Sequence, residues 1–375
     1  MISKWGQVCL LALALVGVPS GWAQTASGEI PRAKLEAIEA AVSAEMSRQG
    51  IPGLSIAIGQ GGQVRFTAGY GLADLENSVP AKAATVYRLA SVSKPMTAVV
   101  VLQLAERGVI DLDAPIQKYV PAFPEKPWPV TARLLLGHLG GVRHYRDDEP
   151  ANTRPYSSAI ESLALFKDDP LVAEPGTRFV YSTYGYNLLG AAVEGATGKP
   201  FFEALREGVL GPAGMVSTRV DEVAPLIPNR AQGYIRLPSG DLRNSPLADV
   251  SSKVPGGGLC STAADVARFA QALGGVPLLK KEGLAQMLTS MRTREGRMTS
   301  YGLGLNVSGP GRRREAWHTG GQERVSTVLY VQPDPGISVV LLGNLQHASL
   351  TDLARRVADL LTAETTLVSP AAARP

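Results

Sequence analysis

A serine and a lysine stand three residues apart in the segment Ser91-Val92-Ser93-Lys94. Residues three apart share one face of a helix, so the serine hydroxyl and the lysine amine can lie within hydrogen-bond reach. A lysine shielded from water can stay neutral and accept the serine proton, which turns the serine into a nucleophile. The alternative is an ordinary helix start, with Ser91 as a cap and Lys94 as a solvated charge.

The residues that follow favour the catalytic interpretation. Residues 96–104 are apolar on nearly every side, and this pattern is typical of a buried helix. The amino end of a buried helix offers unpaired N–H groups to an anion. We therefore expect Ser91 and Lys94 to lie on the floor of a cleft.

Two later segments carry further groups with chemical potential. Tyr181 begins the run Tyr-Ser-Thr-Tyr-Gly-Tyr-Asn, where a tyrosine is able to relay protons, although three tyrosines within six residues leave its role open. His318 is followed by Thr319, Gly320 and Gly321, and such glycines let a substrate approach the backbone closely. The four histidines show no zinc-binding spacing, so we expect neither a metal nor another cofactor.

Composition narrows the class of protein. The chain has 375 residues, 45% of them hydrophobic, which is enough for one large domain or two that share an interface. The net charge is +4, but lysines and arginines are scattered and no basic stripe with interleaved aromatics occurs. We therefore expect no nucleic-acid partner, and the sequence leaves the oligomeric state open.

The first 23 residues are typical of a secretory signal peptide. Lys4 precedes an apolar stretch from Val8 to Val18, which is too short to span a bilayer. The segment then ends with Gly21-Trp22-Ala23, before Gln24. The alternative is a retained amino-terminal anchor. Cleavage would leave Cys260 as the one cysteine, so the mature chain would lack an internal disulfide and a membrane span. These features predict a periplasmic or secreted protein.

Hydrophobic patterning predicts an antiparallel sheet built from both ends of the chain. A helical pattern over 32–49 precedes two alternating segments joined at Gly61-Gly62, and residues 328–342 form a second strand pair before a closing helix near 350–360. Residues 111–290 show mainly helical pieces. The predicted fold is α/β of the α+β type, with a sheet domain of residues 24–110 plus 291–375 and an inserted, mostly helical domain of residues 111–290.

The order Ser91-x-x-Lys94, Tyr181-Ser-Thr183 and His318-Thr-Gly320 resembles the serine beta-lactamase and penicillin-binding-protein superfamily. The flanking segments 137–141, 175–176 and 257–262 are similar to its class C-like branch. Residues 117–126 and 141–145 are most similar to bacterial relatives of the mitochondrial serine beta-lactamase-like protein. The resemblance spans residues 32–362 and implies the beta-lactamase/transpeptidase-like fold.

This resemblance implies roles for individual residues. Ser91 would attack a carbonyl and become acylated, while Lys94 and Tyr181 would share the acid and base work. The backbone N–H groups of Ser91 and Gly321 would form the oxyanion hole. His318 would polarise Tyr181 or meet a substrate carboxylate, with a charge that depends on pH near neutrality, or else make a structural hydrogen bond.

Three positions, Thr183, Thr319 and Gly320, would contact the substrate. Thr183 stands where class C lactamases usually have asparagine, so one hydroxyl replaces an amide that both donates and accepts. That departure weakens the case for beta-lactam side-chain recognition.

The leading hypothesis is therefore a secreted serine hydrolase that cleaves small ester or peptide bonds through an acyl-enzyme on Ser91. The first alternative is a true beta-lactamase or DD-carboxypeptidase, which acts on beta-lactams or peptidoglycan peptides. The second alternative is a non-catalytic protein that binds cell-wall peptides or serves assembly.

Overall fold

The computed structural model describes residues 24–25, 30–146, 149, 152–274, 278–309 and 314–363. The predicted signal peptide, residues 1–23, lies outside the described residues. Among the helices in these ranges, none is both long enough and apolar enough to cross a membrane.

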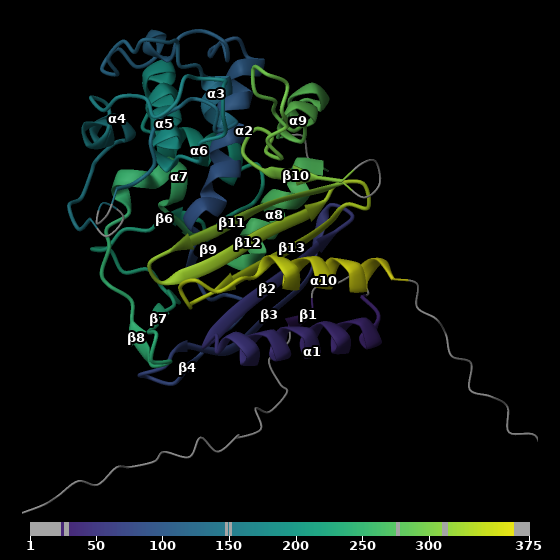
Figure 1. The fold of residues 1–375 in the computed structure, drawn as a ribbon. Helices are drawn as coiled ribbons and strands as arrows, with labels where there is room; N and C mark the ends of the chain where they lie inside the picture. The colour runs from purple at the N-terminus through teal and green to yellow at the C-terminus, as the bar shows by residue number, and fades with distance from the viewer. Residues whose placement is uncertain are drawn as a thin grey trace, which may run out of the picture.

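An antiparallel sheet joins the two ends of the chain, as predicted (Figure 1). Its strands, in spatial order, are β1 (Gln24–Thr25), β3 (Gln63–Asp74), β2 (Gly53–Gln60), β13 (Ile337–Gly343), β12 (Val325–Gln332), β11 (Glu315–Gln322) and β10 (Asn306–Ser308), with β4 (Val79–Pro80) beside β3. Strand β2 from the amino-terminal part pairs directly with β13 from the carboxy-terminal part. The predicted hairpin turn at Gly61-Gly62 is confirmed, because Gln60 pairs with Gln63 across it.

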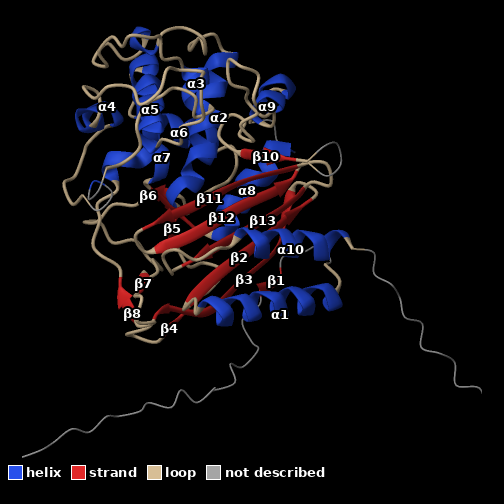
Figure 2. Cartoon of the chain, in the orientation of Figure 1, coloured by secondary structure: helices blue, strands red, loops and turns tan. Residues whose placement is uncertain are grey.

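The sheet is covered on both faces because its central strands are apolar on both sides. Ile56 and Ile58 of β2 belong to one core cluster, while Ala57 between them belongs to the other, as the two-residue period of a strand requires. Helices α1 (Arg32–Gln49) and α10 (Thr351–Thr362) cover the first face, and α8 (Ala263–Gly274) packs on the second (Figure 2). The mixed α/β class is thereby confirmed.

The second core lies largely among helices. These are α2 (Ser93–Glu106), α3 (Ala132–Leu136), α4 (Ala159–Ser162), α5 (Thr183–Thr197), α6 (Phe201–Leu205), α7 (Val254–Gly257) and α9 (Lys281–Met287). Short strands accompany them: β5 (Tyr87–Arg88), β6 (Arg219–Val220) and β9 (Leu259–Ser261) form one small sheet, and β7 (Tyr234–Arg236) and β8 (Leu242–Asn244) form another.

The division at residues 110 and 290 stays a prediction, and two helices pack across it. Helix α2, from the predicted sheet domain, lies against α5 and α7 of the helical region. Helix α8, from the predicted insertion, packs on β2, β3 and β13 of the sheet. The reason is burial: α2 is apolar all round and needs helices on every side, whereas the apolar face of α8 completes the sheet core.

Candidate active site

Ser91 lies in a short 3-10 helix, η1 (Ala90–Val92), that runs directly into α2. Ala90 has a φ of 50°, a left-handed conformation that costs a non-glycine residue free energy and recurs at functional sites. Strand β5 precedes this turn, and its Arg88 pairs with Cys260 of β9. Ser91 is therefore held between a strand and the start of a buried helix, as the apolar run predicted.

Lys94 lies in the first turn of α2, and its side chain is fully buried. Its Nζ atom is 2.9 Å from Ser91 Oγ, 3.1 Å from Thr183 Oγ1 and 2.7 Å from the carbonyl oxygen of Gly256. Burial, and then the nearby charge of Lys253, hold the pKa of Lys94 well below its ordinary value. A neutral Lys94 has two N–H groups for Gly256 and Thr183 and one lone pair left for the Ser91 hydroxyl proton.

Tyr181 approaches the same serine oxygen from the segment before α5. Its hydroxyl lies 2.7 Å from Ser91 Oγ and donates to it. Burial raises the pKa of Tyr181 well above its ordinary value, and the hydrogen bond to Ser91 only partly opposes this rise. Tyr181 is therefore protonated at rest, and the structure joins all three predicted groups around one atom.

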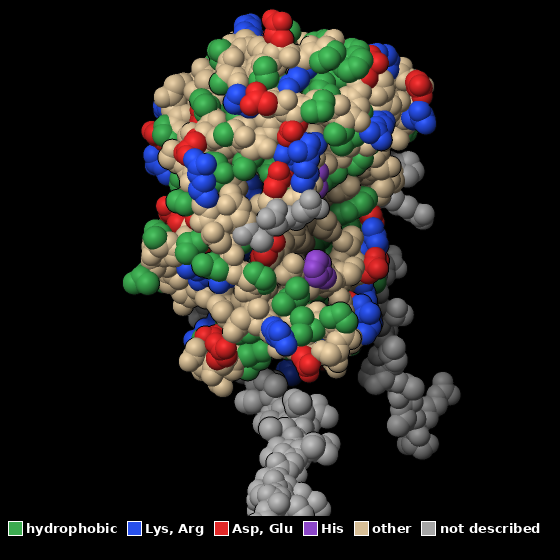
Figure 3. Space-filling model, turned by 60° about the vertical axis from the view of Figure 1, so that its left-hand side comes forward, with side chains coloured by type: hydrophobic (Ala, Val, Ile, Leu, Met, Phe, Trp, Pro, Cys, Tyr) green, Lys and Arg blue, Asp and Glu red, His purple; other side chains and the backbone are tan. Residues whose placement is uncertain are grey.

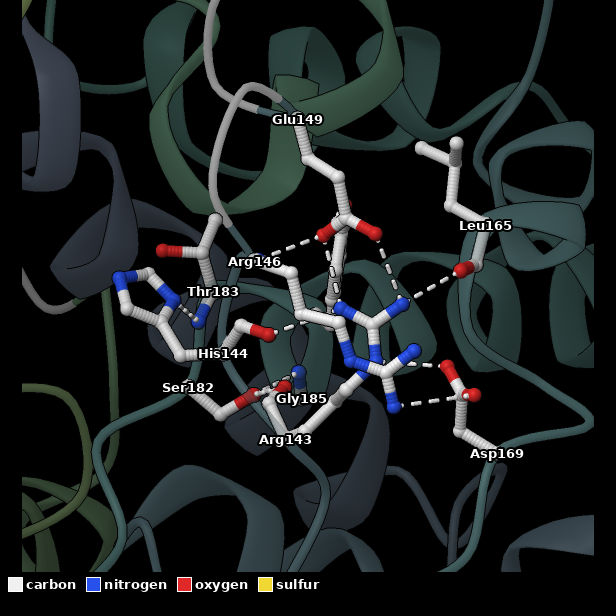
Figure 4. Close-up of polar contacts among 10 residues, drawn as sticks. Arg143, His144, Arg146, Glu149, Leu165, Asp169, Ser182, Thr183 and Gly185 are labelled. Carbon is white, nitrogen blue, oxygen red and sulfur yellow. Dashed lines mark hydrogen bonds and ion pairs between the residues drawn. The ribbon is translucent and has the colours of Figure 1, made fainter.

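The segment at Ser182 and Thr183 is fixed by a neighbouring loop (Figure 4). The N–H of Ser182 donates to His138 Nδ1, and the N–H of Thr183 donates to His144 Nδ1, both at 3.2 Å. The Ser182 hydroxyl donates to the Arg143 carbonyl at 2.6 Å. This loop belongs to the stretch that carries the Gly137–Gly141 motif, which explains why that motif accompanies the catalytic segments.

A buried arginine anchors that loop in turn. The Arg143 guanidinium contacts the Glu149 carboxylate at 2.7 Å and the Asp169 carboxylate at 2.6 Å (Figure 4). Glu149 also accepts from the Tyr184 hydroxyl at 2.9 Å, one residue beyond Thr183. Two carboxylates compensate the buried charge, so the network restrains both the loop and the start of α5.

His318 of β11 lies beside the catalytic groups without contacting them by hydrogen bonds. Its Nδ1 is 2.7 Å from the Thr319 carbonyl, which only accepts, so Nδ1 carries the proton and Nε2 accepts from the Tyr301 hydroxyl at 3.0 Å. Burial lowers the pKa of His318 to about 3. The expectation of a charge that changes near neutral pH is therefore wrong, because the ring is enclosed.

The three residues after His318 alternate in orientation. Thr319 and Gly321 are exposed and line a cavity together with Ser91, whereas Gly320 is buried. A Cβ on Gly320 would lie 2.3 Å from the Leu89 carbonyl oxygen. The structure thus places Gly320 at the contact between β11 and the nucleophile turn, outside the lining of the cavity. The oxyanion role of the Ser91 and Gly321 N–H groups stays a prediction.

The cavity at Ser91 has a volume of about 410 Å³. Its described lining includes residues that sequence reasoning missed: His144, Tyr145, Lys253, Gly256, Gln322, Glu323, Gln346 and His347. His144 and Tyr145 belong to a segment, residues 141–145, that the sequence marked only as a family resemblance, and Lys253 belongs to no motif. Among the described residues, no cluster of histidine, cysteine or acidic side chains could hold a metal ion.

The fold and the two contacts at Ser91 Oγ, from Lys94 and Tyr181, define a serine hydrolase of the beta-lactamase and penicillin-binding-protein superfamily. Residues 38–363 match the Beta-lactamase family, and the chain belongs to that family. It is 31% identical to the human serine beta-lactamase-like protein LACTB, mitochondrial, across 82% of this chain and 76% of the human protein. It is 27% identical to penicillin-binding protein 4* of Bacillus subtilis (strain 168), across 77% of this chain and 67% of that protein. The class C-like branch stays a prediction.

Solved structures show the same fold. The octameric penicillin-binding protein homologue from Pyrococcus abyssi aligns with a TM-score of 0.76 and 27% identity, over 87% of this chain and 77% of that one. The D-amino acid amidase from Ochrobactrum anthropi SV3 aligns with a TM-score of 0.75 and 24% identity, over 88% of this chain and 98% of that one. The latter comparison supports the fold alone.

Proposed function

We propose that this chain is a periplasmic or secreted serine hydrolase that cleaves small ester or peptide bonds through an acyl-enzyme on Ser91. The observation that carries the proposal is the pair of contacts at Ser91 Oγ, 2.9 Å from Lys94 Nζ and 2.7 Å from the Tyr181 hydroxyl. One group is suited to remove the serine proton and the other to supply a proton, as acyl transfer requires.

In acylation, Ser91 Oγ bonds to the substrate carbonyl carbon while its proton passes to the neutral Lys94 amine. The carbonyl oxygen becomes negative and is stabilised by the backbone N–H groups of Ser91 and Gly321. The bond to the leaving group then breaks, and the Tyr181 hydroxyl donates its proton to the departing nitrogen or oxygen. The products of this half-reaction are the Ser91 ester, a Tyr181 phenolate and a protonated Lys94.

Deacylation reverses these transfers. The Tyr181 phenolate removes a proton from a water molecule, whose oxygen bonds to the acyl carbon. The bond from that carbon to Ser91 Oγ breaks, and Lys94 returns its proton to the serine. The free acid leaves, and all three side chains are restored to their starting protonation states.

The contact between Lys94 and Thr183 bears on the substrate. The Thr183 hydroxyl is used by Lys94, so it offers a substrate amide less than a free asparagine side chain would. This supports a simple ester or peptide over a beta-lactam. The similarity to penicillin-binding protein 4* keeps peptidoglycan peptides, and with them a DD-carboxypeptidase, as the second candidate.

The first experiment is intact-protein mass spectrometry of the purified chain with a fluorophosphonate, nitrocefin, a p-nitrophenyl ester and a D-Ala-D-Ala peptide, each with turnover measured in parallel. An adduct on Ser91 with fast ester or peptide turnover and slow nitrocefin turnover is the expected result. Rapid nitrocefin turnover would instead indicate a beta-lactamase. Retained hydrolysis by Ser91→Ala would contradict the mechanism, and the lack of any adduct would indicate a binding protein.

Export is tested separately. The full chain expressed in a bacterial host should appear in the periplasm with a mass that lacks residues 1–23. A cytoplasmic location of the folded protein, or membrane attachment with the full mass, would contradict the proposed export and cleavage.

A further inference from the structure

His138 is a buried histidine that the proton transfers described above do not use. It follows α3 and is only 1% exposed, and it is not one of the described residues that line the Ser91 cavity. Its φ is 57°, the left-handed conformation that favours glycine. Backbone strain of this kind persists where the surroundings impose it, and it recurs at functional sites. The contacts of His138 show what the strained position achieves.

His138 holds the backbone on both sides of Tyr181. Its carbonyl oxygen accepts from the Val180 N–H at 2.8 Å, and its Nδ1 accepts from the Ser182 N–H at 3.2 Å. Residues 179–182 belong to no helix or strand, so no regular element supplies partners for these two N–H groups. A single residue therefore fixes the chain immediately before and immediately after Tyr181.

The ring of His138 also packs against the ring of Tyr181. The two ring centres are 4.4 Å apart, with an angle of 42° between the planes. The rings of Tyr301 and Tyr186 lie 4.7 Å and 5.2 Å from the same imidazole. The imidazole is thus packed among three tyrosine rings and supports the one whose hydroxyl lies 2.7 Å from Ser91 Oγ.

The protonation state of His138 suits this role. Because Nδ1 accepts from an N–H group, the ring proton is on Nε2. Burial lowers the pKa of His138 well below its ordinary value, so Nδ1 stays available as an acceptor at neutral pH. The buried Nε2 atom has no hydrogen-bond partner among the described residues, which is unfavourable for stability. Both this atom and the strained φ cost stability, so the contacts with the Tyr181 segment explain the histidine better than stability does.

We propose that His138 is the positioning residue of Tyr181. It accepts from the N–H groups on both sides of Tyr181 and packs against its ring, and so holds the Tyr181 hydroxyl where it can protonate the leaving group. This inference rests on the proposed function, because it assigns a supporting residue to the acid of that reaction. His138 itself exchanges no proton with the substrate.

Three substitutions of His138 separate positioning from packing and from strain. His138→Asn keeps an acceptor oxygen near the place of Nδ1, His138→Gln fills more of the site but carries its amide farther out, and His138→Gly relieves the backbone. If positioning matters, Asn should be the most active of the three. If filling the space matters, Gln should be the best, and if strain alone matters, Gly should be the best.

The readouts are kcat/KM for phenyl acetate, whose phenoxide takes up the Tyr181 proton, and the rate of Ser91 labelling by a fluorophosphonate, whose fluoride needs none. His138→Gly and His138→Gln should lower kcat/KM by about 10- to 100-fold, the effect of a small misplacement of a reacting group. Labelling should change much less. His138→Asn should recover most of the activity. Circular dichroism gives the folded fraction, to which each rate is normalised.

A double mutant tests whether His138 acts through the Tyr181 hydroxyl. Adding His138→Gly to Tyr181→Phe should cause little further loss of kcat/KM, because the group that His138 positions is already absent. Ser78→Gly is the control for backbone freedom, since Ser78 has a φ of 53° at an exposed position. It should leave both readouts unchanged.

Four results would overturn the inference: equal losses of turnover and labelling in the His138 variants, additive losses in the double mutant, full activity of His138→Gly, or a folded His138→Asn that is no more active than His138→Gln. Labelling of the wild-type protein separates the two proposals. Normal wild-type labelling with any of these four results contradicts only the role of His138. A wild-type protein that the fluorophosphonate does not label contradicts the proposed function itself.

Discussion

The Tyr181 hydroxyl and Lys94 Nζ contact the same atom, Ser91 Oγ, at 2.7 Å and 2.9 Å. Both side chains are buried, and burial raises the pKa of Tyr181 but lowers the pKa of Lys94. It keeps the tyrosine protonated and favours the neutral lysine, because each group avoids its charged form. The resting site therefore holds one proton donor and one proton acceptor at Ser91 Oγ.

Tyr181→Phe tests the donor half of this arrangement. The change removes the hydroxyl that protonates the leaving group and later activates water, while the ring remains in place. We expect kcat for a peptide or anilide to fall by about 10²- to 10⁴-fold, the usual contribution of a general acid or base. Fluorophosphonate labelling should fall much less, because fluoride leaves without protonation. Equal losses in both measurements would contradict a role for Tyr181 as an acid.

Thr183→Val tests the support of Lys94. Valine keeps the shape of threonine but removes the Oγ1 atom that accepts from Lys94 Nζ. The loss of one neutral hydrogen bond predicts a decrease in kcat of about fivefold, from roughly 1 kcal/mol. Thr97→Val is the matched control, since the Thr97 hydroxyl bonds the Pro255 carbonyl and not Lys94. A similar decrease in both variants would indicate a general packing effect.

Gly320→Ala tests the contact between β11 and the nucleophile turn. An alanine Cβ would lie 2.1 Å from Thr327 Oγ1 and 2.3 Å from the Leu89 carbonyl oxygen, so the strand and the turn would have to separate. We expect the free energy of unfolding to fall by about 1–3 kcal/mol and labelling of Ser91 to slow sharply. Gly274→Ala, where no atom of the described residues lies within 4 Å of the new Cβ, should change neither quantity. Normal labelling in Gly320→Ala would show that the turn adapts.

The sequence predicted the elements of this site better than their contacts. The sequence identified Ser91 and Lys94 by their spacing of three residues. It identified Tyr181 by its place in the ordered set of family motifs. The sheet was predictable because β2, β3, β12 and β13 alternate or border strong turns. Helical periodicity likewise located α1 and α10.

The remaining features depend on tertiary packing that no local pattern encodes. Tyr301 reaches His318 from a different segment, and its hydrogen bond decides which His318 nitrogen is protonated. Lys253, in the 3-10 helix Ser251–Lys253, and Glu323, in the turn between β11 and β12, line the cavity without belonging to any sequence motif. No pattern in the sequence indicated that α8 would pack on the sheet, because the apolar face of an amphipathic helix packs equally well on a sheet or on other helices.

The surface charge bears on another prediction from the sequence, the lack of a nucleic-acid partner. On the face drawn in Figure 3, basic and acidic side chains are interspersed. This agrees with the scattered lysines and arginines of the sequence, from which no nucleic-acid partner was predicted. The absence of such a partner stays a prediction, which an electrophoretic mobility assay with duplex and single-stranded DNA would test.

The burial of His318 predicts a specific dependence of stability on pH. Its pKa is about 3 in the folded protein and 6.5 in the reference state, so below pH 6.5 the unfolded chain binds a proton that the folded chain does not. Stability is therefore complete above pH 6.5 and decreases as the pH falls toward 3. At pH 4 the loss from this residue is about 3 kcal/mol, since each pKa unit corresponds to about 1.4 kcal/mol.

Urea unfolding of the wild-type protein and His318→Gln at pH 7 and pH 4 measures this loss. The wild type should lose more stability between the two pH values than the variant, because glutamine does not titrate. His144, whose pKa burial lowers to about 4, adds a loss of the same sign that both proteins share. His347→Gln, at an exposed position, is the control and should follow the wild type. Equal losses in His318→Gln and the wild type would mean that the imidazole is open to protonation, and would reopen a catalytic role for its charge.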